Sequence, residues 1–239
     1  MYYMCDIIGL SCNEEDRLTR SLPLFGELFS RGHPDGWGIA YFDGSRARVK
    51  RAPGVAVESS LFFDTIKKAR SKNIISHLRS GTGGDSCEAN CHPFVRPYNG
   101  RDWIFAHNGW VNDVERHPDA DGDTDSEQIF HQMMDHIAEY TNGGAIRGMY
   151  PAVKRAIKRM FDSYGRDIRL NFLMTDGDMH FAFSHYPNKP IYMLRRVKGY
   201  GGAILLSTRM FGSWNWERIP KDRLLAVNNG EVLVLSGRI

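Results

Sequence analysis

The chain has 239 residues, of which 42% are hydrophobic and 25% are charged, and its formal net charge is only +3. This balance is typical of a globular domain and argues against a disordered polyelectrolyte or a strongly basic nucleic-acid-binding protein. No stretch approaches the roughly 20 apolar residues of a membrane span, and four cysteines are too few for a disulfide framework. We therefore expect a cytoplasmic protein without nucleic-acid or membrane partners.

Hydrophobic periodicity in the first half of the chain predicts strands alternating with two helices. A hairpin is predicted where two β-rich runs flank the turn pair Asp43-Gly44. A loop rich in glycine and small polar residues, 81–94, follows the third strand region. The expected elements are a strand at 5–11, a helix at 19–31 with Pro23 near its start, the hairpin at 36–52, a helix at 58–71, and strands at 73–81 and 103–111.

In the second half two helices precede a run of strands. Thr124 and Glu127 have the spacing of a capping box, which predicts that a helix starts there and extends over 124–140. The predicted elements that follow are a helix at 144–164 and strands at 167–175, 179–186, 191–197, 203–210 and 222–235. With no repeat or linker to mark a boundary, residues 1–239 are interpreted as one α+β domain with mainly antiparallel strands.

Cys5 is the first residue with distinctive chemistry. If the chain before it were removed, its α-amino group, with a pKa of roughly 7.7 to 8, could take the proton of its own thiol. Met4 immediately precedes it, so initiation at Met4 followed by methionine removal would expose it. The alternative is that Cys5 is a small apolar residue on a buried strand.

Asn108-Gly109, Arg79 and Asp125 are three further candidates. An Asn-Gly pair at a strand end can direct an amide and a backbone N–H at one oxyanion, although it is also a common turn pair. Arg79 ends a strand and can hold a carboxylate by two parallel hydrogen bonds. Asp125, in a first helical turn, either caps the helix or pairs with an ammonium group. Together with Cys5 they describe a pocket for an α-amino acid whose side chain carries an acyl carbon.

These residues and their surroundings resemble the class II glutamine amidotransferases of the N-terminal-nucleophile hydrolase superfamily. The similarity covers most of the chain and is nearest to small members that consist of the glutaminase domain alone. The segments that carry it are MCDIIGLS, HPDGWGIAYF, SHLRSGTGG, CHPF, FAHNGWV and GDTDSE.

The resemblance implies a fold, a reaction and a set of roles. The fold would be a four-layer αββα sandwich with two mainly antiparallel sheets between helices, and no cofactor is expected. Cys5 would be the nucleophile, with Asn108 and Gly109 as the oxyanion site. The substrate-binding residues would be Arg79 for the α-carboxylate, Thr82 and Trp37 as pocket walls, and Asp125 for the α-amine.

The implied activity is hydrolysis of glutamine or another γ-glutamyl amide through a γ-glutamyl thioester. The substrate is a small molecule, and ammonia would pass to a separate synthetase subunit or be released with glutamate. Residues 1–4 leave alternatives open: they are a propeptide, or the start is mis-assigned, or they block the Cys5 amine and leave a non-catalytic amino-acid-binding protein. A hydrolase acting on a larger γ-glutamyl amide is a further alternative.

A metal site is the main competing interpretation. Cys87, Cys91 and His92 give three soft ligands within six residues, but the C-x3-C-H spacing fits no common zinc module. His131 and His136 lie five residues apart on one predicted helix, which is not the spacing of a metal-binding pair. No metal site is therefore expected.

Overall fold

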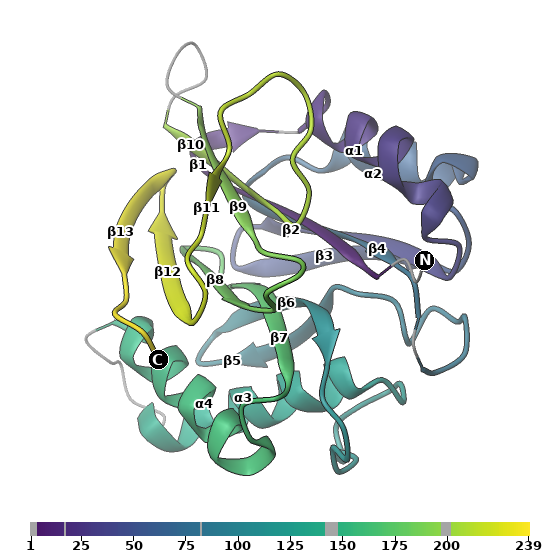
Figure 1. Ribbon diagram of the computed structural model, residues 1–239. Coiled ribbons are helices and arrows are strands. Elements are labelled where there is room, and N and C mark those ends of the chain that lie inside the picture. Colours follow the sequence, from purple (N-terminus) through teal and green to yellow (C-terminus); the bar gives the residue numbers. More distant parts are fainter. Residues whose placement is uncertain (1–3, 17, 82, 142–147, 197–201) are drawn as a thin grey trace.

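The computed structural model describes residues 4–16, 18–81, 83–141, 148–196 and 202–239. Its helices and strands form four layers, with two sheets packed between two pairs of helices (Figure 1). The predicted αββα sandwich is confirmed. Among the described residues, every helix falls short of the length and apolarity that spanning a membrane requires.

The first sheet has seven strands in the described part of the chain, each antiparallel to its neighbours. They are β1 (Asp6–Asp16), β2 (Gly36–Asp43), β3 (Arg46–Ala52), β4 (Ser71–Arg79), β9 (Tyr192–Arg196), β10 (Ala203–Ser207) and β11 (Glu217–Arg218). Their order across the sheet is β11-β9-β10-β1-β4-β2-β3, so β1 lies at the centre. The hairpin predicted at Asp43-Gly44 joins β2 to β3.

The second sheet has six strands in the same described ranges, also antiparallel. They are β5 (Phe94–Tyr98), β6 (Arg101–Trp110), β7 (Arg169–Thr175), β8 (Met179–His185), β12 (Arg223–Asn228) and β13 (Glu231–Leu235), in the order β13-β12-β8-β7-β6-β5. The Asn-Gly pair is not a turn, because β6 continues through it and pairs Asn108 with Asn171 and Gly109 with Leu170 of β7.

Helices cover the outer face of each sheet. On the first sheet lie α1 (Ser21–Phe29), α2 (Ser60–Lys68) and the short 3-10 turns η1 (Ser30–Gly32) and η2 (Ala56–Glu58); on the second lie α3 (Asp125–Thr141) and α4 (Met149–Tyr164). Pro23 sits in the first turn of α1, where its missing N–H costs little. Half of the predicted capping box forms, because Thr124 Oγ1 accepts the Glu127 N–H while the Glu127 carboxylate accepts the N–H groups of Asp121 and Gly122.

Three apolar clusters fill the spaces between the four layers. One joins α3 and α4 to their sheet, one joins α1 and α2 to theirs, and the third lies between the sheets. Strand β1 serves two of them, since Ile8 and Leu10 face the helices whereas Ile7 faces the other sheet. Both faces of its first half are therefore buried, which explains why this strand reads as an unbroken apolar run.

A substitution at Gly38 tests how closely the loop before β5 packs against β2. A Cβ on Gly38 would lie 2.1 Å from the carbonyl oxygen of His92. We expect Gly38→Ala to lower the free energy of unfolding by about 1–3 kcal/mol, because one backbone must move away from the other. Gly237→Ala, where a Cβ would meet nothing within 4 Å, is the control for urea denaturation. Equal stability of the two variants would contradict this packing.

Candidate active site

A cavity of about 440 Å³ opens where β1 and α3 begin and where β4 and β6 end. Its lining includes Cys5, Arg79, Asn108, Gly109 and Asp125. Five of the residues singled out in the sequence therefore share one cavity, although they come from four segments of the chain. Thr82 lies outside the described residues.

The Cys5 thiol lies against the backbone of Ser80. Its Sγ is 3.4 Å from both the Ser80 nitrogen, which donates to it, and the Ser80 carbonyl oxygen. Burial raises the pKa of the Cys5 thiol to about 11, and the nearby charges of Lys189 and Arg79 offset only part of that effect. The thiol is thus protonated at neutral pH and needs a base before it can attack an acyl carbon.

The peptide groups on both sides of Cys5 are held by side chains. The Met4 carbonyl accepts hydrogen bonds from Lys189 Nζ and from His33 Nε2, the latter at 2.8 Å. The Cys5 carbonyl accepts from Lys189 Nζ at 2.6 Å and from Asn108 Nδ2. With Met4 attached, the Cys5 nitrogen is an amide, which cannot serve as a base.

Asp6, the next residue, is fully buried and gathers four partners. Its carboxylate pairs with Lys189 Nζ and Arg209 Nε, each at 2.8 Å, and with His33 Nε2 at 3.2 Å, and it accepts the Thr208 hydroxyl at 2.9 Å. Burial alone would raise the pKa of Asp6, but hydrogen bonds and charge from His33 and Lys189 outweigh it and lower the pKa to about 2.

Arg79 is buried, and its guanidinium is already engaged. The two terminal nitrogens donate to four backbone carbonyls, those of Asp35, Gly83, Gly84 and Asp85, at 2.9 to 3.4 Å. Arg79 therefore holds the loop that follows β4. A substrate carboxylate would have to take the place of some of these carbonyls to form the two parallel hydrogen bonds expected of this arginine.

Asp125 opens helix α3, and its carboxylate accepts two backbone hydrogen bonds. Oδ2 accepts from the Val111 N–H at 2.7 Å, and Oδ1 accepts from the Ser126 N–H at 2.8 Å. The residue both stabilises the start of the helix and lines the cavity. Stabilising the start of the helix and pairing with an ammonium group in the cavity are therefore compatible roles for Asp125.

Gly109 and Asn108 occupy the end of β6 at the cavity. A Cβ on Gly109 would lie 1.8 Å from the Arg169 carbonyl oxygen, so a side chain cannot be accommodated without separating β6 from β7. Asn108 Oδ1 is buried and has no hydrogen-bond partner in the described ranges. Such an atom needs a donor from a bound group or from water.

Trp37 is not a wall of this cavity, so that expectation is wrong. Its ring is fully buried between the first sheet and α2, where it makes an edge contact with Phe62 at 5.2 Å between centroids. Residues alternate between the two faces of β2, and Trp37 lies on the face that packs against the helices.

The Cys87, Cys91 and His92 motif does not gather its ligands. Cys91 Sγ contacts the carbonyl oxygens of Cys87 and Ala52, and His92 Nδ1 bonds His77 Nε2 at 2.8 Å. Burial lowers the pKa of both histidines well below the ordinary value, so both are neutral. His92 lines the cavity, with its Nε2 buried and unpaired among the described residues.

The sequence assigned no role to Lys189, Arg209, Thr208 or His33. They contact Asp6 or the Cys5 backbone from positions far along the chain. The one available signal was an acidic residue directly after the cysteine on a strand predicted to be buried, which requires partners of opposite charge.

Asp6 provides a test of this network. Its lowered pKa stabilises the fold by about 2 kcal/mol above pH 4, and that contribution is lost as the pH falls through 2. We expect Asp6→Asn to cost about 3–5 kcal/mol at neutral pH, because Lys189 and Arg209 lose their counter-ion. The difference from the unsubstituted protein should shrink on acidification in urea denaturation.

The control is Asp43→Asn, which removes an ion pair with Arg48 in which both side chains are more than half exposed. That change should cost less than about 1 kcal/mol. Losses of similar size at the two positions would contradict the central role of Asp6.

Comparison with known proteins places this geometry in a family. The profile of the glutamine amidotransferases class-II family matches residues 4–210. A Haemophilus influenzae protein provisionally named as a glutamine amidotransferase is 29% identical over 202 residues, which cover 81% of this chain and 67% of that protein. The γ-glutamyl-hercynylcysteine sulfoxide hydrolase of Mycobacterium tuberculosis H37Rv is 35% identical over 78 residues, about a third of each chain.

Among solved structures, the glutamine phosphoribosylpyrophosphate amidotransferase of Bacillus subtilis shares the fold. The TM-score is 0.69 at 15% identity, and the superposition covers 97% of this chain and 49% of that chain. At this identity the comparison shows the fold alone.

Proposed function

The chain belongs to the class II glutamine amidotransferases, and we propose that it hydrolyses a γ-glutamyl amide at Cys5 through a γ-glutamyl thioester. The observation that carries the proposal is the meeting of Cys5, Asn108, Arg79 and Asp125 around one cavity of about 440 Å³. The γ-carbonyl of a γ-glutamyl group requires a thiol and an amide donor. The α-carboxylate and α-ammonium group at its other end require a cation and an anion.

The first step needs a base at Cys5. Once the Met4–Cys5 bond is cleaved, the free α-amino group takes the thiol proton, and Sγ attacks the γ-carbonyl carbon. Lys189 donates to the carbonyls on both sides of the Cys5 nitrogen, so its charge lies close to the amine. A like charge at that range lowers the pKa of an amine, which keeps more of it in the neutral, basic form.

The later steps use the residues at the end of β6. The Asn108 amide nitrogen, whose second N–H is left after it donates to the Cys5 carbonyl, and the Gly109 N–H stabilise the oxyanion formed when Sγ bonds to carbon. Removing one such donor typically costs about 3 kcal/mol. The C–N bond breaks as the leaving amine takes the proton from the Cys5 ammonium. Water then attacks the thioester and gives a proton to the free Cys5 amine; the C–S bond breaks, glutamate leaves, and that proton passes from the amine to the thiolate.

At the head of the substrate, Asp125 pairs with the α-ammonium and Arg79 with the α-carboxylate. For Arg79 this requires part of the loop 83–85 to release the guanidinium, because its terminal nitrogens now donate to loop carbonyls. Substrate binding and loop position are therefore linked in this proposal. Ammonia would be released or passed to a separate acceptor subunit.

A larger leaving amine is the second candidate, and an adjoining cavity favours it. This cavity has a volume of about 660 Å³ and shares Trp110 and Asn112 with the first. It offers room beyond that needed for ammonia. The hydrolase from Mycobacterium tuberculosis, which matches a third of this chain, bears the name of a larger γ-glutamyl compound.

The state of the Cys5 nitrogen is the decisive test. We expect protein that begins at Cys5 to release ammonia from glutamine, or an amine from a γ-glutamyl amide, at least about 10²-fold faster than protein that retains Met4, because only the former has the amine as base. Intact mass and N-terminal sequencing define each form, and turnover is measured on both.

Cys5→Ala should abolish turnover in the shortened form, whereas Cys12→Ser, on the strand that follows Cys5 but outside the cavity, should retain it. Equal turnover with and without Met4 would overturn the role of the amine. In that case the retained form would be the enzyme and another base would act.

Asp125→Asn tests recognition of the α-amine while preserving the shape of the side chain. We expect kcat/KM for glutamine to fall about 10- to 100-fold, because a charge-assisted hydrogen bond is lost. For glutaramate, which is glutamine without its α-amine, the same change should have little effect. A parallel loss on both substrates would mean that Asp125 acts only through the start of α3.

A further inference from the structure

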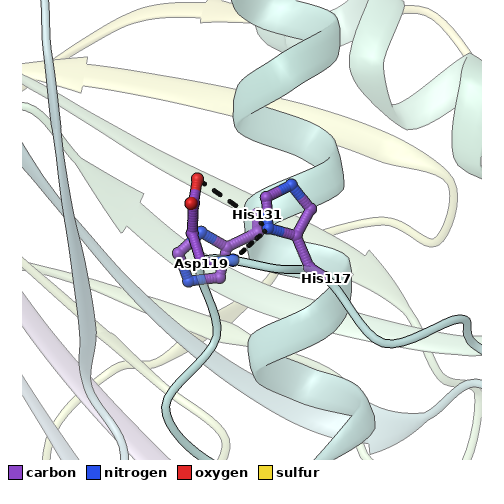
Figure 2. Close-up of side chains that lie close together, drawn as sticks. All are labelled: His117, Asp119 and His131. Atoms are coloured by element: carbon purple, nitrogen blue, oxygen red, sulfur yellow. Dashed lines mark hydrogen bonds and ion pairs between the residues drawn. The ribbon is translucent and has the colours of Figure 1, made fainter.

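A second group of chemically active side chains lies away from the Cys5 cavity, on the loop between β6 and α3 and on α3 itself. His117 and Asp119 belong to the loop, and His131 projects from the helix (Figure 2). One potential ligand atom from each residue lies within 4.8 Å of the other two. Among the residues whose placement is described, no other group of three histidine, cysteine or acidic side chains meets this condition.

His117 is oriented as metal-bound histidines commonly are. Its Nε2 bonds the carboxylate of Asp135 at 2.9 Å. That hydrogen bond places the ring proton on Nε2 and leaves Nδ1 with a free electron pair. Nδ1 now accepts the Asp119 N–H at 3.1 Å, which is a contact that a metal would replace. A carboxylate behind the distal nitrogen fixes the ring and increases its basicity as a ligand.

His131 has a buried nitrogen that nothing in the described structure satisfies. The residue is only 5% exposed, and Nδ1 has no hydrogen-bond partner among the described residues. Its ring is stacked on that of His117, with centroids 4.9 Å apart and an angle of 15° between the planes. A buried nitrogen without a hydrogen-bond partner, next to a second imidazole, is available as a metal ligand.

Asp119 provides an exposed carboxylate, with Oδ2 3.9 Å from His117 Nδ1. Arg96 lies beside it and contacts Asp119 at 3.4 Å and Asp135 at 2.7 Å, and it donates to the His131 carbonyl at 2.7 Å. These contacts order both acids and the first turns of α3. Two carboxylates against one guanidinium leave a local charge of −1, which favours a divalent cation.

We propose that His117, His131 and Asp119 form a binding site for one divalent transition metal of the Zn²⁺ type, with water completing the coordination. Two imidazoles and one carboxylate suit such an ion. In a tetrahedral site with bonds of 2.0–2.1 Å the ligand atoms lie about 3.3 Å apart, so binding draws the three groups together. The exposed side chain of Asp119 can make most of that movement.

The site would act structurally, since none of the three residues lines the Cys5 cavity. A metal there ties the loop of residues 111–124 to α3. That helix begins with Asp125, whose carboxylate accepts the Val111 N–H at the other end of the same loop. Metal binding would thus hold the loop and the Asp125 carboxylate in place. The inference stands independently of the reaction proposed at Cys5.

The test is titration of the full, chelator-stripped chain with Co²⁺, followed by competition with Zn²⁺. We expect one equivalent of Co²⁺ to bind with visible d–d absorption and without the near-ultraviolet charge-transfer band of a thiolate ligand. His131→Gln and the less buried His117→Gln should each lose this signal, so the test does not depend on one variant folding. Asp135→Asn should weaken binding about 10- to 100-fold.

His136→Gln is the matched control. His136 lies on the same helix and also has a buried Nδ1 without a hydrogen-bond partner, 3.8 Å from a Glu139 carboxylate oxygen, but it belongs to no group of three ligands among the described residues. It should bind Co²⁺ as the unsubstituted chain does. Absence of binding, a thiolate band, or binding unchanged in both His131→Gln and His117→Gln would overturn the proposal.

Discussion

The buried carboxylate of Asp6 is the interaction on which the arrangement around Cys5 depends. Its partners come from the segment after η1, from the loop after β8 and from the end of β10. A charge with no exposure to water is tolerated only when it is paired and hydrogen-bonded. Because Asp6 directly follows Cys5, the partners that neutralise the carboxylate also fix the position of the thiol.

The same network determines the chemistry that is open to Cys5. Lys189 and His33, which pair with Asp6, also hold the carbonyl of Met4. When the Met4–Cys5 peptide bond is intact, these contacts hold the Met4 carbonyl next to the Cys5 thiol, whose pKa is raised to about 11. With the peptide cleaved they would surround an amine. The same side chains therefore surround a protonated thiol in the chain that retains Met4. In our proposal they surround a thiol activated by its own amine in the chain that begins at Cys5.

The sandwich architecture explains why the cavity lies where it does. β1 begins at the cavity, close to the points where β4 of the first sheet and β6 of the second end and where α3 begins (Figure 1). The thiol of Cys5 and the guanidinium of Arg79 thus come from the layer of the first sheet, the amide of Asn108 from that of the second, and the carboxylate of Asp125 from the helix layer beyond it. The guanidinium of Arg79 is shared between a structural role in the loop after β4 and its proposed role in binding substrate, so loop and ligand compete for the same donors.

Local patterns in the sequence were sufficient for most elements. Alternating and continuous apolar runs predicted the strands, Asp43-Gly44 the hairpin, and Thr124 the start of α3. These features depend on neighbours in the chain, whose spacing is visible in the sequence. The candidates for the cavity were also accessible, since Cys5, Arg79, Asn108 and Asp125 are residue types with chemistry of their own, and the family resemblance grouped them.

Tertiary structure decided the rest. Trp37 could be assigned to a strand, but β2 is buried on both faces, so alternation could not tell which face meets the helices. Lys189 and Arg209 reach Asp6 across 183 and 203 positions, and an ion pair between distant segments leaves no periodic trace in either. The pairing of His131 with His117 rather than with His136 likewise depends on how a loop folds back on its helix. The sequence determined which elements form and which residues carry chemistry; only the packing of the four layers determined which of those residues meet.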